Sequence, residues 1–125
     1  MTYTRLNPKM VTATPTRKLG TGGNVKAFRH GDMLIVSGGY SGCTVSSTYT
    51  WADLFEIPAS TLGVTSLTQL GSYVDVSGGG PSYQGNVADT GGQMYIGSGT
   101  IKGQMQTQAA FSSKIVRFIF VAVAS

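Results

Sequence analysis

Residues 114–123, KIVRFIFVAV, decide the fold class of this chain. In an extended strand, successive side chains point to opposite faces. The two faces then carry Ile115, Arg117, Ile119, Val121 and Val123, and Val116, Phe118, Phe120 and Ala122. A strand with water on one side should alternate between polar and apolar residues, but this one is apolar on both faces after Arg117. The segment therefore predicts the longest and most central strand, whose second face needs either an opposing sheet or a neighbouring subunit.

Other short strands are expected along the rest of the chain, at residues 25–29, 33–37, 51–57, 73–77, 83–88, 93–97 and 100–105. Turn residues at 30–32 (HGD) and 98–99 (SG) join two pairs of these runs into hairpins. Pro58 ends the run 51–57, because proline does not fit a central strand. Residues 38–50 look like a loop, and residues 64–70 are ambiguous between strand and loop.

No run of eleven residues keeps a helical period, and glycine supplies 18 of the 125 residues. Glycine destabilises helices but suits turns, and charged residues make up only 11% of the chain. Essentially no helix is expected beyond a single turn. The sequence predicts an all-β fold, an antiparallel β-sandwich or jelly-roll-like barrel of about seven to nine short strands.

The positive charge of the chain is concentrated at its beginning. Residues 1–23 hold four basic residues and no acid, whereas residues 24–125 hold five of each sign. With two prolines and a glycine-rich end, residues 1–23 are expected to form a basic extended arm or linker, and regular structure is expected to begin at Asn24. The balanced body, residues 24–125, lacks the lysines and arginines that a nucleic-acid groove needs.

Residues for catalysis or metal binding are scarce. The chain has one histidine, His30, and one cysteine, Cys43, which cannot supply a zinc site or an intrachain disulfide. Cys43 is expected to be a small buried side chain, and His30 to lie in a surface turn rather than in a catalytic pocket. Asp53 and Glu56 lie near Trp51, but no spacing indicates paired catalytic carboxylates. We expect no enzyme activity, no cofactor and no metal.

Targeting and membrane signals are also missing from the sequence. The first residues lack the apolar core of a signal peptide, and the most apolar run, residues 118–124, is too short to span a bilayer as a helix. We expect no membrane insertion.

Aromatic residues give the one positive indication of a binding site. Tyr40, Tyr49 and Tyr83 are expected in loops rich in glycine and serine, and Trp51 follows such a loop. Their flat faces can stack on sugar rings, and the tyrosine hydroxyls can bond to a ligand. The alternative for Trp51 and Tyr95 is a place in the core, where aromatic residues of small β domains usually lie.

The order of these motifs resembles the C-terminal head domain of phage tail-fibre and baseplate receptor-binding proteins. The resemblance covers residues 24–125 and rests on NVKAFRHGDMLIVSG (24–38), WADLFEIP (51–58), GQMYIGSGTIKGQM (92–105) and the terminal KIVRFIFVAV. The chain departs from the family after Pro58, where ASTLGVTSL replaces the usual glycine-aromatic-Arg-Pro continuation. That departure weakens any site inherited near this loop.

The resemblance implies a homotrimeric β-sandwich or barrel head that binds saccharide on a host cell surface and uses no cofactor. Loop aromatics together with Asp53 or Asp89 would then contact the sugar. The protein would lie on the extracellular side of a virion, made in the host cytoplasm without a signal peptide. The alternative function is a structural virion or assembly protein, such as a decoration or connector subunit, held to other virion proteins through the basic arm.

Overall fold

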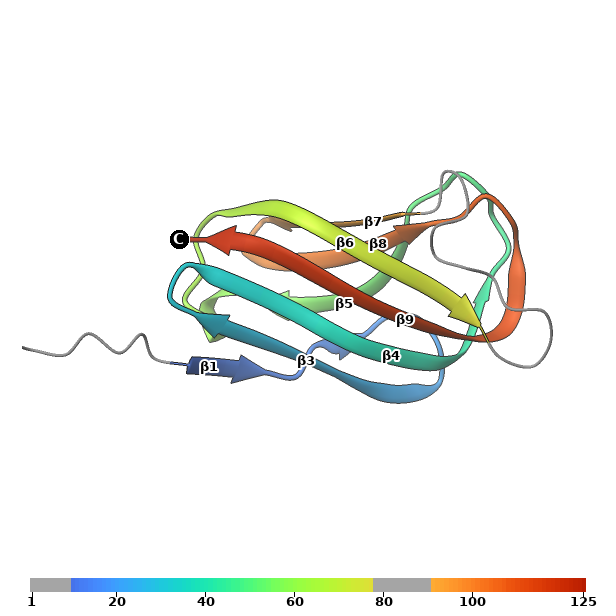
Figure 1. Cartoon of the computed structure of the whole chain (residues 1–125), viewed down its shortest axis with the longest axis horizontal. Helices are drawn as coiled ribbons and strands as arrows, with labels where there is room; N and C mark the ends of the chain where they lie inside the picture. The colour runs from blue at the N-terminus through green and yellow to red at the C-terminus, as the bar shows by residue number, and fades with distance from the viewer. Residues whose placement is uncertain (1–9, 78–90) are drawn as a thin grey trace, which may run out of the picture.

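A computed structural model describes residues 10–77 and 91–125, which form two antiparallel β-sheets packed face to face (Figure 1). The larger sheet has the strand order β1-β3-β4-β9-β6, with bounds β1 (Met10–Ala13), β3 (Gly22–His30), β4 (Met33–Val45), β9 (Phe111–Ala124) and β6 (Leu67–Ser77). The smaller sheet has the order β2-β5-β8-β7, with bounds β2 (Thr16–Arg17), β5 (Ala52–Pro58), β8 (Thr100–Gln106) and β7 (Gly91–Gly97). The predicted all-β sandwich is confirmed.

Within the described ranges the helical content is one 3₁₀ turn, Ala59–Thr61, after Pro58. Both predicted hairpins are present: β3 turns into β4 at Gly31-Asp32, and β7 turns into β8 at Ser98-Gly99. No helix in the described part of the chain is long and apolar enough to cross a membrane. The expected edge strand at 83–88 lies outside the described residues.

β9 is the longest strand and lies inside its sheet, between β4 and β6. Its inner face is buried against the smaller sheet and consists of Val116, Phe118, Phe120, Ala122 and Ala124. On the outer face Ile119 and Val123 remain 40% and 39% exposed. The opposing sheet therefore covers only one of the two apolar faces, and burial within the sandwich does not explain the other.

Four aromatic rings fill the space between the sheets. Phe55 stacks on Phe118 with ring centroids 5.6 Å apart, and it meets the ring of Phe120 edge-on at 5.7 Å. Tyr40 packs on the other side of Phe118 at 5.7 Å. Gly103 on β8 makes room for this cluster, because a Cβ atom there would overlap the Phe55 ring. The aromatic cluster thus fixes the distance between β8 and the larger sheet.

Residues 38–45 belong to β4, so the expected loop at 38–50 is wrong over its first part. Gly38 has φ of 142°, and a Cβ atom there would collide with the backbone of Asn24 on β3. The pairing of β4 with β9 also shifts register between Tyr40 and Cys43. The glycines in this stretch allow a close approach of two strands and an irregular ladder. In the sequence alone, such a glycine-rich stretch resembles a loop.

Within the described residues, strand structure is already present at Met10–Ala13, so the expected start at Asn24 is wrong. β1 pairs with Ala27–His30 of β3, and β2 pairs with β5 in the other sheet. The chain crosses from one sheet to the other at Thr14-Pro15, where a proline removes no ladder hydrogen bond. Val11 and Ala13 pack against the core. In the described part of the arm, residues 10–23 therefore belong to the sandwich framework.

β6 resolves the ambiguity at 64–70, because it begins at Leu67 and continues through the predicted run 73–77. A register shift between Gln69 and Gly71 turns the Gln69 side chain toward β7. Its amide nitrogen donates to the carbonyl of Gly92 at 3.2 Å, and its oxygen accepts from the Met94 backbone N–H at 2.6 Å. These two bonds join the sheets along one side of the sandwich.

Candidate functional site

A hollow of about 240 Å³ beside Trp51 matches the predicted aromatic site best. Trp51 immediately precedes β5 and leaves 41% of its surface exposed, so it does not belong to the core. The other lining residues are Leu19, Thr44, Val45, Ser46, Ser47, Thr50 and Ala52. Four of these carry hydroxyl groups. A second, more open hollow of about 410 Å³ shares Thr44, Val45 and Ser46 with it.

Tyr49 lies two residues before Trp51 in the same loop and is 54% exposed. Its φ of 57° is left-handed, and its backbone N–H donates to the carbonyl of Thr107 at 2.9 Å. This bond ties the loop to the segment that follows β8. Tyr49 therefore has a fixed backbone and an accessible ring near the Trp51 hollow, although it is not among the lining residues.

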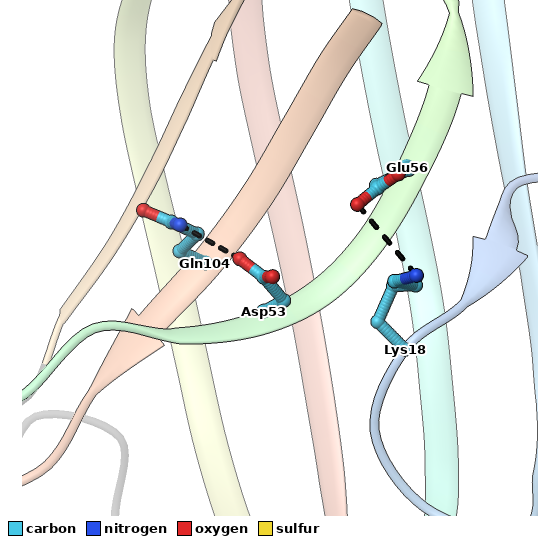
Figure 2. Close-up of polar contacts among 4 residues, drawn as sticks. All are labelled: Lys18, Asp53, Glu56 and Gln104. Carbon is cyan, nitrogen blue, oxygen red and sulfur yellow. Dashed lines mark hydrogen bonds and ion pairs between the residues drawn. The ribbon is translucent and has the colours of Figure 1, made fainter.

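Asp53 belongs to a polar row across the smaller sheet rather than to the hollow. Its Oδ1 atom accepts a hydrogen bond of 2.7 Å from Nε2 of Gln104 (Figure 2). Oε1 of Gln104 in turn accepts a hydrogen bond of 2.6 Å from Nε2 of Gln93. Figure 2 also shows Glu56 further along β5, paired with Lys18 at 3.7 Å. The structure gives Asp53 a cross-strand partner and does not bring it together with Trp51 in one cavity.

Tyr40 lies on β4 and is 3% exposed, so its expected place in an open loop is wrong. The register with Val116 of β9 turns its side chain inward. Its hydroxyl oxygen is buried and has no hydrogen-bond partner among the described residues. Burial raises the pKa of Tyr40 to about 12, and the nearby positive charge of Arg17 partly opposes the shift.

Tyr40 also lines a separate hollow of about 240 Å³, next to the crossing between β1 and β2, which we call the polar hollow. Its other lining residues are Thr14, Pro15, Arg17, Gly23, Asn24, Val25 and Lys26. We did not predict Arg17 or Lys26 as site residues. For Arg17 the signal is the excess of positive charge in residues 1–23, which is expected to form a separate arm, whereas Lys26 belongs to the balanced body and has no such signal.

Tyr83 and Asp89, the two remaining candidates, lie outside the described residues. Tyr95, which we considered a core residue, is 39% exposed on β7. A larger hollow of about 810 Å³ lies near the Ser98-Gly99 turn, but its lining is made of small residues with Val64 and Ile96 and contains no aromatic side chain. Although this hollow is larger, it lacks the aromatic side chain that the predicted site requires.

The reactive residues are placed as follows. Cys43 is fully buried, as expected, and burial raises the pKa of its thiol. His30 is exposed at the end of β3. Within residues 10–77 and 91–125, no three His, Cys, Asp or Glu side chains gather as metal ligands would.

No protein-family model, curated protein or solved structure matches this chain.

Proposed function

We propose that this domain is a non-enzymatic saccharide-binding head that attaches a phage virion to its host. One observation carries the proposal: an exposed indole stands beside a hollow whose rim holds four hydroxyl-bearing residues. The apolar face of a sugar ring stacks on an aromatic side chain, and its hydroxyls exchange hydrogen bonds with serine and threonine. The likeness of the motifs at 24–38, 51–58, 92–105 and 114–123 to phage receptor-binding heads supports the virion and its extracellular side as the location.

The geometry favours weak binding at each site. The hollow is shallow and small, whereas sites that enclose a drug-sized ligand usually measure 300–1,000 Å³. A dissociation constant on the order of 1 mM for one sugar is therefore reasonable. Useful attachment would come from several heads that bind one polysaccharide together, because linked sites raise the effective concentration.

A glycan array followed by titration of the best hit tests this proposal. Trp51→Ala should abolish binding or weaken it at least tenfold, because stacking on an aromatic ring is lost. Tyr95→Ala is the matched control, since Tyr95 is similarly exposed but lies on β7 and does not line the Trp51 hollow. An array with no hit, or equal losses in the two variants, would contradict a saccharide site at Trp51.

A second candidate function is assembly, and the outer face of the larger sheet favours it. On this face Met10, Met33, Tyr73, Ile119 and Val123 are each 37% to 53% exposed. The register places Met33 beside Val123 and Tyr73 beside Ile119, whereas His30 lies between Met10 and Met33. Contiguous apolar patches of more than a few hundred Å² are rare on monomers and often mark contacts between proteins.

We propose that copies of this chain cover the patch in a homotrimer, as the resemblance to phage heads implies. A standard interface takes roughly 800 Å² from each partner, so the patch would form the apolar centre of a larger contact. Light scattering at micromolar concentration should give about three times the 13.0 kDa of one chain. Ile119→Lys should lower that mass because it places a charge in the patch. A mass of one chain would exclude this assembly.

A further inference from the structure

The polar hollow at the β1–β2 crossing has an uncompensated positive charge. Arg17 and Lys26 both line it. Within residues 10–77 and 91–125 the ion pair formed is Lys18–Glu56, so neither of these two cations meets a carboxylate there. Lys26 donates instead to the hydroxyl of Thr14 at 2.9 Å, and Arg17 donates from Nε to the carbonyl of Gly20 at 3.1 Å. The terminal nitrogens of Arg17 remain available to an anion.

Arg17 and Lys26 come together because the chain changes sheets between β1 and β2. β1 pairs with β3 only over Ala27–His30, and the chain then leaves for the smaller sheet. Over Gly22–Lys26, β3 pairs with β4 on its other side, and no described strand pairs with its outer edge. An unpaired strand edge presents backbone N–H and C=O groups. The edge residues Gly23, Asn24 and Lys26 line the hollow.

Tyr40 adds an independent indication of a ligand. It lines the hollow, and its buried hydroxyl lacks a partner among the described residues, although buried polar groups are almost always hydrogen-bonded. The Tyr40 hydroxyl is a donor that lacks an acceptor among the described residues. An anionic acceptor in the hollow could supply the missing partner.

We infer that this hollow binds the carboxylate of an acidic saccharide through Arg17, Lys26 and the Tyr40 hydroxyl. The planar guanidinium of Arg17 matches two carboxylate oxygens, Lys26 adds a point charge, and Asn24 and Thr14 offer polar groups to sugar hydroxyls. This inference rests on the proposed saccharide function and names its substrate class. The same segment also supplies Leu19 to the Trp51 hollow, so residues 14–19 contribute to both hollows.

The test is a titration followed by backbone amide chemical shifts, with sodium glucuronate, glucose and inorganic phosphate at matched ionic strength. Glucuronate should saturate with a dissociation constant on the order of 1 mM and move the amides of Thr14, Arg17, Asn24 and Lys26. Glucose should leave these amides in place. Inorganic phosphate that binds there as tightly as glucuronate would overturn the carboxylate assignment.

Variants test the named side chains. Arg17→Gln and Lys26→Gln should each weaken glucuronate binding about tenfold, since charge-assisted hydrogen bonds are lost. Tyr40→Phe keeps the packed ring and should weaken binding about threefold. Lys18→Gln is the matched control, because it removes a neighbouring cation that already pairs with Glu56. Equal losses in Lys18→Gln and Arg17→Gln would indicate general charge attraction and overturn the site.

The two proposals fail separately. Trp51→Ala should leave the glucuronate constant unchanged, because Trp51 does not line the polar hollow. Array binding that depends on Trp51, with no glucuronate shifts at residues 14–26, would keep the saccharide function and overturn the acidic subsite.

Discussion

Gly103→Ala adds a single methyl group against the Phe55 ring, in the aromatic cluster between the two sheets. A Cβ atom at this position would overlap three carbon atoms of the Phe55 ring. Ordinary contacts between carbon atoms are about 3.5–4.0 Å, so the ring or the β8 backbone must move by about 1 Å or more. The ring is fully buried against Phe118 and Phe120, and β8 is paired with β5 on one side and β7 on the other. Neither can move without breaking other contacts.

Overpacking a well-filled core usually costs 1–3 kcal/mol, and the degree of overlap here points to about 3 kcal/mol. That is a large share of a total stability of about 5–15 kcal/mol. With a urea dependence of about 2 kcal/mol per molar, the unfolding midpoint should fall by roughly 1.5 M. Circular dichroism during urea denaturation measures this shift directly.

Gly91→Ala on β7 is the matched control. No heavy atom of the described residues lies within 4 Å of a Cβ atom built there, and Gly91 is not among the glycines with positive φ. Its free energy of unfolding should stay within about 0.5 kcal/mol of that of the parent protein. Phe55→Leu, which shortens the clashing side chain, should make Gly103→Ala less costly by at least about 1 kcal/mol in a double-mutant cycle. Equal midpoints for Gly103→Ala and Gly91→Ala would refute the role given to Gly103.

Two further predictions concern pH and the first strands. The folded pKa of Tyr40 is about 12, above its ordinary value of 10.0, so its neutral form stabilises the fold fully below pH 10 and this contribution is lost as pH rises to 12. Unfolding free energy should therefore fall by up to about 1.4 kcal/mol per pH unit over this window, and urea titrations should show a shallower fall in Tyr40→Phe but not in Tyr95→Phe. Deletion of residues 1–13 removes β1 and its four paired positions and should lower the melting temperature by roughly 10 °C relative to deletion of residues 1–9, whereas equal melting temperatures would show that β1 is dispensable.

The sequence predicted correctly those strands whose position follows from neighbouring residues, namely β9 and the two hairpins. The run KIVRFIFVAV alternates large side chains without a turn residue, and the two hairpins have turn residues at the right spacing. β9 and both hairpins could therefore be located. The second half of β4 was missed because Gly38 and Gly39 look like a loop in isolation. Gly38 allows the close approach of β3 and Gly39 that of β9, and no single segment reveals these contacts between strands.

The candidate site divides in the same way. Trp51 could be found because an aromatic residue after a serine- and threonine-rich stretch is a local signal. The inward direction of Tyr40 depends on its register with β9, so a prediction from its glycine-rich neighbours placed it in a loop. Arg17 and Lys26 are nine residues apart and meet only because the chain changes sheets at Pro15. Charge counting found the basic segment but could not show that it folds back on the sandwich.

Residues 10–19 therefore have a structural role and, under the proposals above, a binding role at once. β1 closes part of one sheet, β2 extends the other, and the residues between and after them line both hollows. An anion bound by Arg17 and Lys26 would neutralise two like charges that the fold otherwise holds together without an acid. Since a ligand that binds only the folded state stabilises it, the occupied hollow would hold β2 and the edge of β3 more firmly. Without a ligand, the unpaired edge of β3 and the buried Tyr40 hydroxyl lack hydrogen-bond partners, which costs free energy of folding. The same groups provide hydrogen-bond donors for an acidic ligand.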